Sequence, residues 1–439
     1  GGALADVAAA DDEHARLPKP RGAACAQGGA GQEKGVWRQN QLLFAPRPPW
    51  FSGRALVFSR FPRRYLKKMS YSVTVQPGGL SFAAEPDETL LSAALRQNVA
   101  LPYGCQQGAC GACKCKVTFG QVEPGEALDS ALSPEEAAQG WALACRARAR
   151  SNVVLECEQA AASCLHRPRK LPVRVAEMER LAPDVMRVRL QLPAHQAMPY
   201  HAGQFMDVTL PGGLRRSYSM ANAPAQGEAA EAARLRGQAF VDLHIRHMPG
   251  GALTDRLFSG QVKLRDIWRA ESPKGSFYLR EGSDKPVILL ASGTGFAPLK
   301  AILEHMQQSG SRRPVTLYWG GRRPQDIYLA DWVSCQLERM PALRFVPVVS
   351  DAAPQDGWTG RSGWVHQAVL QDWPDLSGHQ VYACGAPQMV QAARRDFCAQ
   401  AGLPESEFFA DAFTSAADLA PAAARQAEAA EAAQAAEAV

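Results

Sequence analysis

Four cysteines are the residues whose type and spacing most directly predict chemistry. Cys105, Cys110 and Cys113 are separated by four and by two residues, and Cys145 follows thirty-two positions later. This spacing is typical of four thiolates that hold a 2Fe–2S cluster, three of them on one loop. A structural zinc site is the alternative, but such sites usually pair two short cysteine knuckles, and the sequence has one. The spacing therefore predicts an iron–sulfur cluster bound by these four thiolates.

The glycines between these cysteines indicate how the loop must run. Gly104, Gly108 and Gly111 allow the backbone to curl and to turn its N–H groups toward sulfur. Cys115 follows Cys113 by two residues on an expected strand and is predicted not to be a ligand. The other cysteines outside the motifs are expected to be structural or surface thiols: Cys25, Cys157, Cys164, Cys335 and Cys398.

A second group of motifs lies in a strand-rich stretch. The string RSYSMAN, Arg216 to Asn222, combines a cation that can clamp a phosphate, a flat aromatic face and hydroxyl donors suited to a flavin. Further along, Gly250 and Gly251 precede Thr254 at an expected helix start, where backbone N–H groups can hold a phosphate. Either string alone is weak, because Arg and Tyr often alternate on strands, but together they predict a flavin nucleotide site.

Two further strings follow buried strands near the C-terminus. ASGTGFAP, Ala291 to Pro298, lies between an expected strand at 287–290 and an expected helix at 298–307, so its N–H groups can face a pyrophosphate. It is not GxGxxG, which disfavours a plain dinucleotide-binding dehydrogenase. In YACGAPQMV, Cys384 and Gly385 end another strand, where an open α/β sheet binds its ligand. The alternative for Cys384 is an ordinary buried cysteine.

Composition bounds the class of protein. With 439 residues, 46% hydrophobic and 21% charged, the chain is long enough for two to four globular domains. The net charge of +5 arises in residues 1–68, which hold 12 basic and 5 acidic residues, so the remainder is nearly neutral and predicts no nucleic-acid surface. No run of about 18 apolar residues predicts a membrane span. The clustered cysteines favour a reducing, cytoplasmic setting.

The pattern of hydrophobic and capping residues predicts the strands and helices that must position the motifs. A strand hairpin begins at Tyr71, a helix capped by Asp87 follows, and Ser133 with Glu136 forms a capping box before a second helix. Residues 171–280 alternate as in a small barrel, and 285–413 alternate buried strands with helices as in a parallel sheet. The predicted division is 1–68, an unstructured leader with Met69 as the natural start; 69–160, the cluster domain; 161–170, a linker; 171–281, the flavin domain; 282–413, the nicotinamide domain; and 414–439, an Ala-rich tail.

Taken together, the strings resemble the ferredoxin–NADP reductase superfamily over about residues 69–413. Their order is similar to that of the reductases of multicomponent oxygenases, and the C-terminal third looks most like CDP-6-deoxy-3,4-glucoseen reductases. The resemblance implies an α+β and α/β multidomain fold. Its expected parts are a β-grasp plant-type ferredoxin domain, a six-stranded antiparallel FAD-binding β-barrel and a doubly wound parallel-sheet nicotinamide domain.

The resemblance also implies roles for single residues. Arg216 would contact an FAD phosphate, Tyr218 would stack on the flavin and Ser219 would lie near its N5 atom. Cys384 would approach nicotinamide C4, and Phe413 would lie near the flavin, so Ser219, Cys384 and Phe413 are the catalytic candidates. The expected cofactor-binding residues are Arg216, Ser217, Tyr218, Ser219, Asn222, Gly250, Gly251, Thr254, Gly293, Thr294, Gly295, Cys384 and Gly385.

The implied activity is an NADH-dependent reductase that passes electrons from NADH to FAD, then to the 2Fe–2S cluster and on to a redox protein. A deoxysugar dehydrase and an aromatic or alkane oxygenase component are alternative acceptors, and a non-catalytic redox sensor is the alternative from another class. NADPH is the alternative coenzyme, because Arg322 and Arg323 could hold a 2′-phosphate.

Overall fold

The computed structural model describes residues 70–162, 166–196 and 198–414. The expected leader, the tail beyond residue 414, Cys25 and Cys164 lie outside these residues. Within the described part of the chain, no helix is both long and apolar enough to cross a bilayer. Three large sheets organise these residues, and each buries its own hydrophobic cluster or clusters.

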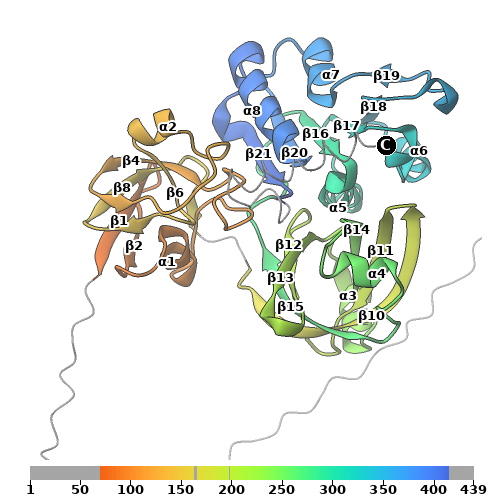
Figure 1. Cartoon of the computed structure of the whole chain (residues 1–439), viewed down its shortest axis with the longest axis horizontal. Coiled ribbons are helices and arrows are strands. Elements are labelled where there is room, and N and C mark those ends of the chain that lie inside the picture. The colour runs from red at the N-terminus through yellow and green to blue at the C-terminus, as the bar shows by residue number, and fades with distance from the viewer. Residues whose placement is uncertain (1–69, 163–165, 197, 415–439) are drawn as a thin grey trace, which may run out of the picture. The chain divides into compact units, whose positions relative to one another are not determined.

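The first sheet is mixed and has five strands in the order β2-β1-β8-β4-β6 (Figure 1). Strands β1 and β2 form an antiparallel hairpin, whereas β8 runs parallel to β1 and antiparallel to β4. Two short strand pairs, β3 with β9 and β5 with β7, complete the unit. The bounds are β1 (Tyr71–Gln76), β2 (Leu80–Ala84), β3 (Val99–Ala100), β4 (Lys114–Phe119), β5 (Val122–Glu123), β6 (Trp141–Leu143), β7 (Arg148–Ala149), β8 (Val153–Glu156) and β9 (Ala161–Ala162).

Two short helices accompany this sheet, α1 (Leu90–Arg96) and α2 (Pro134–Ala138). The capping box predicted for α2 is confirmed, because the Ser133 side chain accepts the Glu136 N–H and the Glu136 side chain accepts the Ser133 N–H. The cap predicted for α1 is wrong. Thr89, not Asp87, is the N-cap, and its hydroxyl accepts the Ser92 N–H, since a cap must directly precede the first helical turn.

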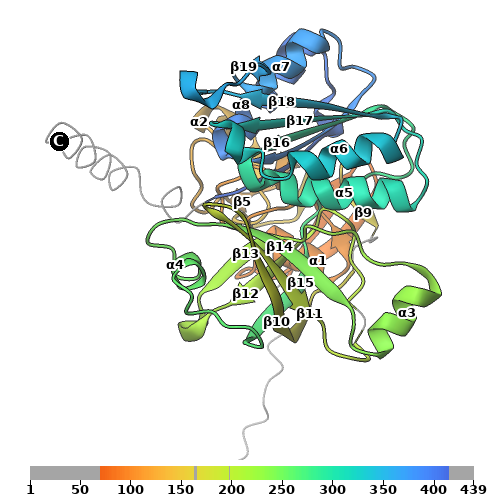
Figure 2. The same cartoon turned by 90° about the vertical axis from the view of Figure 1, so that its right-hand side faces the viewer.

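The second sheet is antiparallel, with six strands in the order β13-β12-β15-β10-β11-β14. Its strands are β10 (Arg169–Ala182), β11 (Val185–Gln191), β12 (Phe205–Thr209), β13 (Arg215–Ser219), β14 (Phe240–Arg246) and β15 (Ile267–Lys274). The two edge strands approach each other through a single antiparallel bridge, Met220 to Leu243, rather than through a continuous ladder. The described residues thus form a curved six-stranded sheet (Figure 2) without a closed ladder, and helices α3 (Gly227–Leu235) and α4 (Thr254–Phe258) lie in its connections.

The third sheet is wholly parallel, in the order β19-β18-β17-β16-β20-β21. The chain therefore winds outward from β16 in both directions, and β16 and β20 flank the switch point. Alternate residues of β16 face opposite helix layers: Leu289 packs with α5 and α6, and Leu290 packs with α7 and α8, which lie on the two faces in Figure 1. This is the doubly wound arrangement that the sequence predicts.

The bounds in this third unit are β16 (Val287–Ser292), β17 (Val315–Gly321), β18 (Leu343–Val349), β19 (Arg361–Ser362), β20 (Gln380–Gly385), β21 (Phe408–Ala412), α5 (Phe296–Gln308), α6 (Ala330–Arg339), α7 (Val365–Asp372) and α8 (Pro387–Ala401). Short 3-10 turns connect several elements: η1 (Pro211–Gly213), η2 (Gly293–Gly295), η3 (Pro324–Asp326), η4 (Pro354–Asp356) and η5 (Glu405–Glu407).

Candidate functional site

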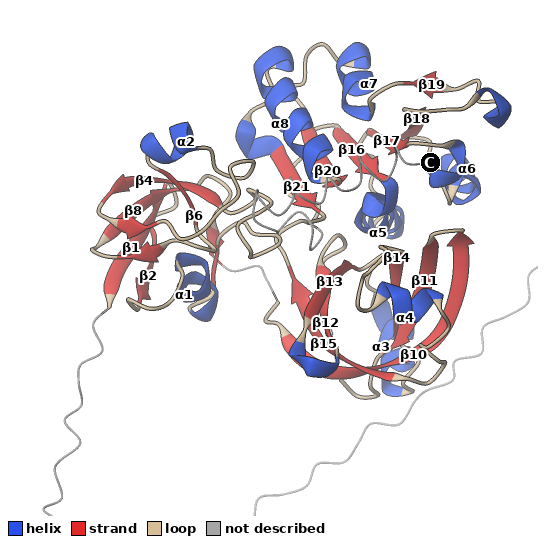
Figure 3. Cartoon of the chain, viewed as in Figure 1, coloured by secondary structure: helices blue, strands red, loops and turns tan. Residues whose placement is uncertain are grey.

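The segment that carries three of the four predicted ligands has no regular secondary structure between β3 and β4 (Figure 3). Gly108 and Gly111 adopt positive φ angles of 78° and 72°, as their predicted role requires. Gly104 does not, but a Cβ there would lie 3.3 Å from the Cys110 sulfur, so its role is close approach. Gln106 also has a positive φ, a feature that sequence reasoning missed.

The four thiols act on one another's pKa in two pairs, Cys105 with Cys110 and Cys113 with Cys145. The hydrogen bond from Cys110, together with backbone N–H groups, lowers the pKa of Cys105 to about 6, and the hydrogen bond from Cys113 lowers the pKa of Cys145. The Cys105 N–H points to the Cys110 sulfur and the Gln107 N–H to the Cys105 sulfur, each at 3.4 Å.

This donor set fits a 2Fe–2S cluster. Each tetrahedral iron of such a cluster takes two thiolates in addition to its bridging sulfides, so two thiol pairs are what the group requires. In the described part of the chain, no three His, Cys, Asp or Glu side chains converge as ligands of a single metal ion.

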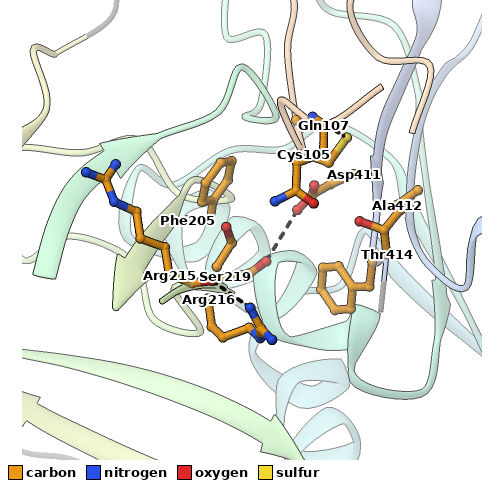
Figure 4. Close-up of a pocket in the computed structure, with 12 residues that line it drawn as sticks. Cys105, Gln107, Phe205, Arg215, Arg216, Ser219, Asp411, Ala412 and Thr414 are labelled. Atoms are coloured by element: carbon orange, nitrogen blue, oxygen red, sulfur yellow. Dashed lines mark hydrogen bonds between the residues drawn. The ribbon is translucent and has the colours of Figure 1, made fainter. Parts of the chain in front are cut away.

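A cavity of about 210 Å³ lies directly beside the cluster loop (Figure 4). Cys105 and Gln107 of the loop line it together with Phe205 at the start of β12, Ser219 at the end of β13 and Phe413 after β21. The remaining lining residues are Gly104, Arg215, Arg216, Ser217, Asp411, Ala412 and Thr414. A predicted cluster ligand therefore shares one cavity with two of the three predicted catalytic residues.

Asp411 is the lining residue that sequence reasoning missed most clearly. Its side chain is buried, and its Oδ2 atom accepts a hydrogen bond from Ser219 Oγ at 3.3 Å (Figure 4). Burial raises the pKa of Asp411 to about 7. Its place at the carboxyl end of β21 was an available signal, because polar residues at such ends face the ligand crevice.

The residues of the RSYSMAN string lie in three different environments. Arg216, Ser217 and Ser219 line the cavity, whereas Tyr218 packs against the core of the antiparallel sheet, and burial raises the pKa of Tyr218 to about 12. The Asn222 side chain is engaged within the chain, since its Oδ1 atom accepts the Asp242 N–H at 2.8 Å. Its position ties the end of β13 to β14.

The predicted Gly-Gly-Thr cradle does not border this cavity. Thr254 is buried, and its hydroxyl donates to the Met248 carbonyl at 2.8 Å and accepts the Met248 N–H, so it closes the turn before α4. Gly250 has a φ of 79° with open space beside its α-carbon. The neighbouring residues Leu253 and Arg256 line a separate cavity of about 530 Å³.

The glycine loop at the switch point is packed too closely for any side chain. A Cβ on Gly295 would lie 2.1 Å from the Cys384 carbonyl oxygen. Gly293 has a φ of 53°, and its carbonyl accepts a hydrogen bond from Trp319 Nε1 at 3.0 Å. Thr294 lies between them in η2, directly before α5, so the loop leads into the N-terminus of a 13-residue helix, as predicted for a pyrophosphate site.

Cys384 and Gly385 lie across from this loop at the end of β20. Cys384 is fully buried, and burial raises the pKa of its thiol well above the ordinary value. Gly385 has a φ of 131°, and a Cβ there would lie 2.2 Å from Ser292 Oγ. The Phe413 N–H donates to the Gly385 carbonyl, and the Phe413 side chain packs against the hydrophobic core that contains Cys384. Phe413 thus borders the cavity and also packs with the core that contains Cys384.

Comparison with known families accounts for all three sheets. Residues 73–150 match the 2Fe-2S iron-sulfur cluster binding domain, residues 172–278 match the oxidoreductase FAD-binding domain, and residues 289–395 match the oxidoreductase NAD-binding domain. Each match covers most of one of the sheets described above, and strands β8 and β21 lie beyond the matched residues. The cofactors that these domains indicate are a 2Fe–2S cluster, FAD and NAD.

Relatives share the whole order of parts. The chain is 36% identical over 345 residues to CDP-6-deoxy-L-threo-D-glycero-4-hexulose-3-dehydrase reductase of Yersinia pestis, a match covering 79% of this chain and 99% of that protein. It is also 36% identical over 333 residues to the aromatic O-demethylase reductase subunit of an Amycolatopsis species, covering 75% and 94%. The crystal structure of the Amycolatopsis cytochrome P-450 reductase GcoB superposes with a TM-score of 0.61 at 34% identity, covering 79% and 99%. The chain therefore belongs to the family of NAD(P)H-dependent iron–sulfur flavoprotein reductases, in which cluster, FAD and NAD domains follow one another in a single chain.

Proposed function

We propose that this protein transfers electrons from NADH to a one-electron redox protein, with the cavity beside Cys105 as the place where flavin and cluster meet. The observation that carries the proposal is the sharing of that cavity by Cys105, Ser219 and Phe413. When bound, NADH would supply a hydride, and FAD would supply a group that accepts this hydride and releases single electrons. The 2Fe–2S cluster would supply one-electron transfer. The division into domains at 69–160, 171–281 and 282–413, with a β-grasp unit and a six-stranded antiparallel barrel, belongs to the same proposal.

The chain's own residues have distinct parts in this scheme. Arg216 and Ser217 would hold the flavin nucleotide, and Ser219 would present its hydroxyl to the reacting edge with Asp411 fixing its orientation. The α5 N-terminus would hold the dinucleotide pyrophosphate, because the Gly293–Gly295 loop brings backbone N–H groups to the start of this helix, with the Arg246 guanidinium beside Gly293. Phe413 would keep water from the space between the flavin and nicotinamide sites.

NADH is the proposed coenzyme because Arg323, one residue of the basic pair after β17, is already paired with carboxylates. The Arg323 guanidinium lies 3.5 Å from the Asp351 carboxylate and 3.4 Å from that of Asp356. The Asp326 carboxylate accepts the backbone N–H groups of Arg322 and Arg323. A 2′-phosphate placed here would meet three carboxylates, whereas a ribose 2′-hydroxyl can donate to one. A higher kcat/KM for NADPH than for NADH would overturn this choice.

The proposed acceptor is a dehydrase component that acts on a nucleotide-linked deoxysugar, as the name of the Yersinia relative states for that protein. An oxygenase component is the second candidate, favoured by the equal identity to the aromatic O-demethylase reductase subunit. Side-by-side measurement of electron delivery to one purified acceptor of each class separates the two candidates.

The direct test is anaerobic single turnover of the isolated protein. Mixing with NADH should bleach the flavin absorbance first and the cluster absorbance second, and an added one-electron protein acceptor should then reoxidise both. A flavin that stays oxidised in the presence of excess NADH would reject the proposal, as would a cluster that never becomes reduced.

A further inference from the structure

Two more cysteines lie behind the cluster loop, on neighbouring antiparallel strands. Cys115 is on β4, and Cys157 directly follows β8. The ladder between these strands pairs Val117 with Leu155 and Lys116 with Glu156. One further step along the same register sets Cys115 opposite Cys157.

Both side chains lie on the core face of the sheet. Cys115 is 1% exposed and Cys157 is 8% exposed, and both belong to the hydrophobic cluster of this unit. The Cys115 thiol donates a hydrogen bond to the Cys113 carbonyl oxygen at 3.6 Å, and the Cys115 and Cys157 thiols each shift the pKa of the other. Directly opposite residues of an antiparallel pair have α-carbons about 4.5 to 5.5 Å apart, which lies within the range that a disulfide spans. The strands therefore hold the two sulfurs where a bond can form without backbone movement.

We propose that Cys115 and Cys157 form a thiol oxidation site, which a hydroperoxide converts to a cross-strand disulfide while the four cluster ligands stay in place. The site is independent of the proposed electron transfer, because neither residue lines the cavity beside Cys105. The cluster ligands pair among themselves, Cys105 with Cys110 and Cys113 with Cys145.

Cys157 is the thiol that reacts first. It is the more exposed of the two, and hydrogen bonds from Cys115 and from the backbone N–H groups of Gln159 and Ala160 lower its pKa. Its sulfur attacks the peroxide, so that an S–O bond forms, the O–O bond breaks, and water leaves with a sulfenic acid behind. The Cys115 sulfur then attacks that sulfenic sulfur, the S–S bond forms, the S–O bond breaks and a second water leaves. Two thiols and one peroxide give one disulfide and two waters.

The test uses the full-length protein with its cluster and FAD bound, exposed to one equivalent of hydrogen peroxide. The sample is then denatured in acid, alkylated, digested and analysed by mass spectrometry. The expected result is a linked pair of peptides containing Cys115 and Cys157, two hydrogens lighter than the unlinked pair, with the cluster absorbance retained. Peroxide treatment of Cys115→Ser in the presence of a 1,3-diketone should label Cys157 as a sulfenic acid.

Cys335→Ser is the matched control, because Cys335 is an exposed thiol on α6 far along the chain from either strand, and it should leave the Cys115–Cys157 link unchanged. Links that join Cys115 or Cys157 to Cys113 or Cys145, with matching loss of cluster absorbance, would overturn the proposal and identify Cys115 as an exchangeable cluster ligand. Full alkylation of both cysteines at a peroxide dose that oxidises Cys335 would overturn it as well. These readings come from the wild-type protein, so they stand even if a variant fails to fold.

Discussion

Cys105 and Cys384 are the same residue type in opposite environments. Cys105 lies on an irregular loop, where its partner thiol and three backbone N–H groups lower its pKa to about 6. Cys384 lies at the end of a central parallel strand, fully buried, where desolvation raises the pKa of its thiol. A loop that turns its amides inward stabilises thiolates for a metal, whereas a strand end packed on all sides keeps a thiol neutral.

The two regions also differ in how their shape is fixed. The cluster loop carries its ligands on curled backbone, although Cys113 and Cys145 also join the core of the first sheet and Cys110 joins a core of the parallel sheet. At the strand ends, a Cβ added at Gly295 or Gly385 would meet atoms of the sheet itself. We therefore expect a ligand replaced by a side chain of similar size to lose function more than stability, and a methyl group added at the strand ends to lose both.

The largest effect is expected from Cys110→Ser in the loop. A hydroxyl is a hard, weak ligand for iron, so cluster content should be lost and electron delivery to a one-electron protein acceptor should fall by about a hundredfold or more. Flavin reduction by NADH and reduction of ferricyanide-type acceptors should persist, since the other two domains have their own cores. Iron analysis and stopped-flow absorbance measure these outcomes, with Cys335→Ser as control. Undiminished delivery after demonstrated cluster loss would show that the flavin serves the acceptor directly.

Gly295→Ala should have the next largest effect, and it should lower both the unfolding free energy and the affinity for NADH. The added methyl group would lie 2.1 Å from the Cys384 carbonyl oxygen, so β16 and β20 must move apart. Overpacking of this kind costs about 2 to 3 kcal/mol of unfolding free energy, and affinity for NADH should fall with it. Gly378→Ala, where a Cβ meets nothing within 4 Å, is the matched control and should change stability by less than about 0.5 kcal/mol. Equal effects of the two substitutions in urea unfolding would contradict the packing argument.

Features that depend on neighbouring residues could be predicted from the sequence, whereas features that depend on distant contacts could not. Local signals predicted the four cluster ligands, which stay a prediction, and they predicted the Ser133 capping box and the alternation of buried strands and helices in the parallel sheet, which the structure confirms. Asp411 and the proximity of Cys115 to Cys157 were missed, because both depend on contacts between segments distant in sequence. The hydrogen bonds of Thr254 with Met248 were missed for another reason: they are local, but the sequence pattern does not show which backbone groups a turn hydroxyl contacts.

Cys384→Ala tests whether the buried thiol takes part in hydride transfer or only packs. The flavin should remain bound, while its reduction by NADH should slow by about tenfold, which corresponds to about 1.4 kcal/mol in the barrier. Rapid mixing under anaerobic conditions measures this rate, and flavin content measures retention of FAD. Cys335→Ala, which removes an exposed thiol, should leave the rate unchanged. An unaltered rate in Cys384→Ala would assign the residue to the core alone.

The smallest effect is expected from His244, which lies on β14 of the antiparallel sheet and is buried, as Cys384 is at the strand end of the parallel sheet. Its Nδ1 atom lies 3.0 Å from the Tyr328 hydroxyl beyond β17, and burial, followed by the charge of Lys300, lowers its pKa to about 3, with Asp242 and Arg187 also acting on it. In the unfolded chain the imidazole binds a proton near its ordinary pKa of about 6.5, so stability is lost as the pH falls below that value. Between pH 7 and pH 6 this loss amounts to about 0.7 kcal/mol.

The variant His244→Gln keeps a hydrogen-bonding group but cannot titrate. Between pH 7 and pH 6 its unfolding free energy should therefore fall by about 0.7 kcal/mol less than that of the wild-type protein, whatever the substitution costs at both pH values. Urea unfolding at the two pH values measures the difference, and parallel pH profiles for the two proteins would show that folding leaves the pKa of His244 at its ordinary value.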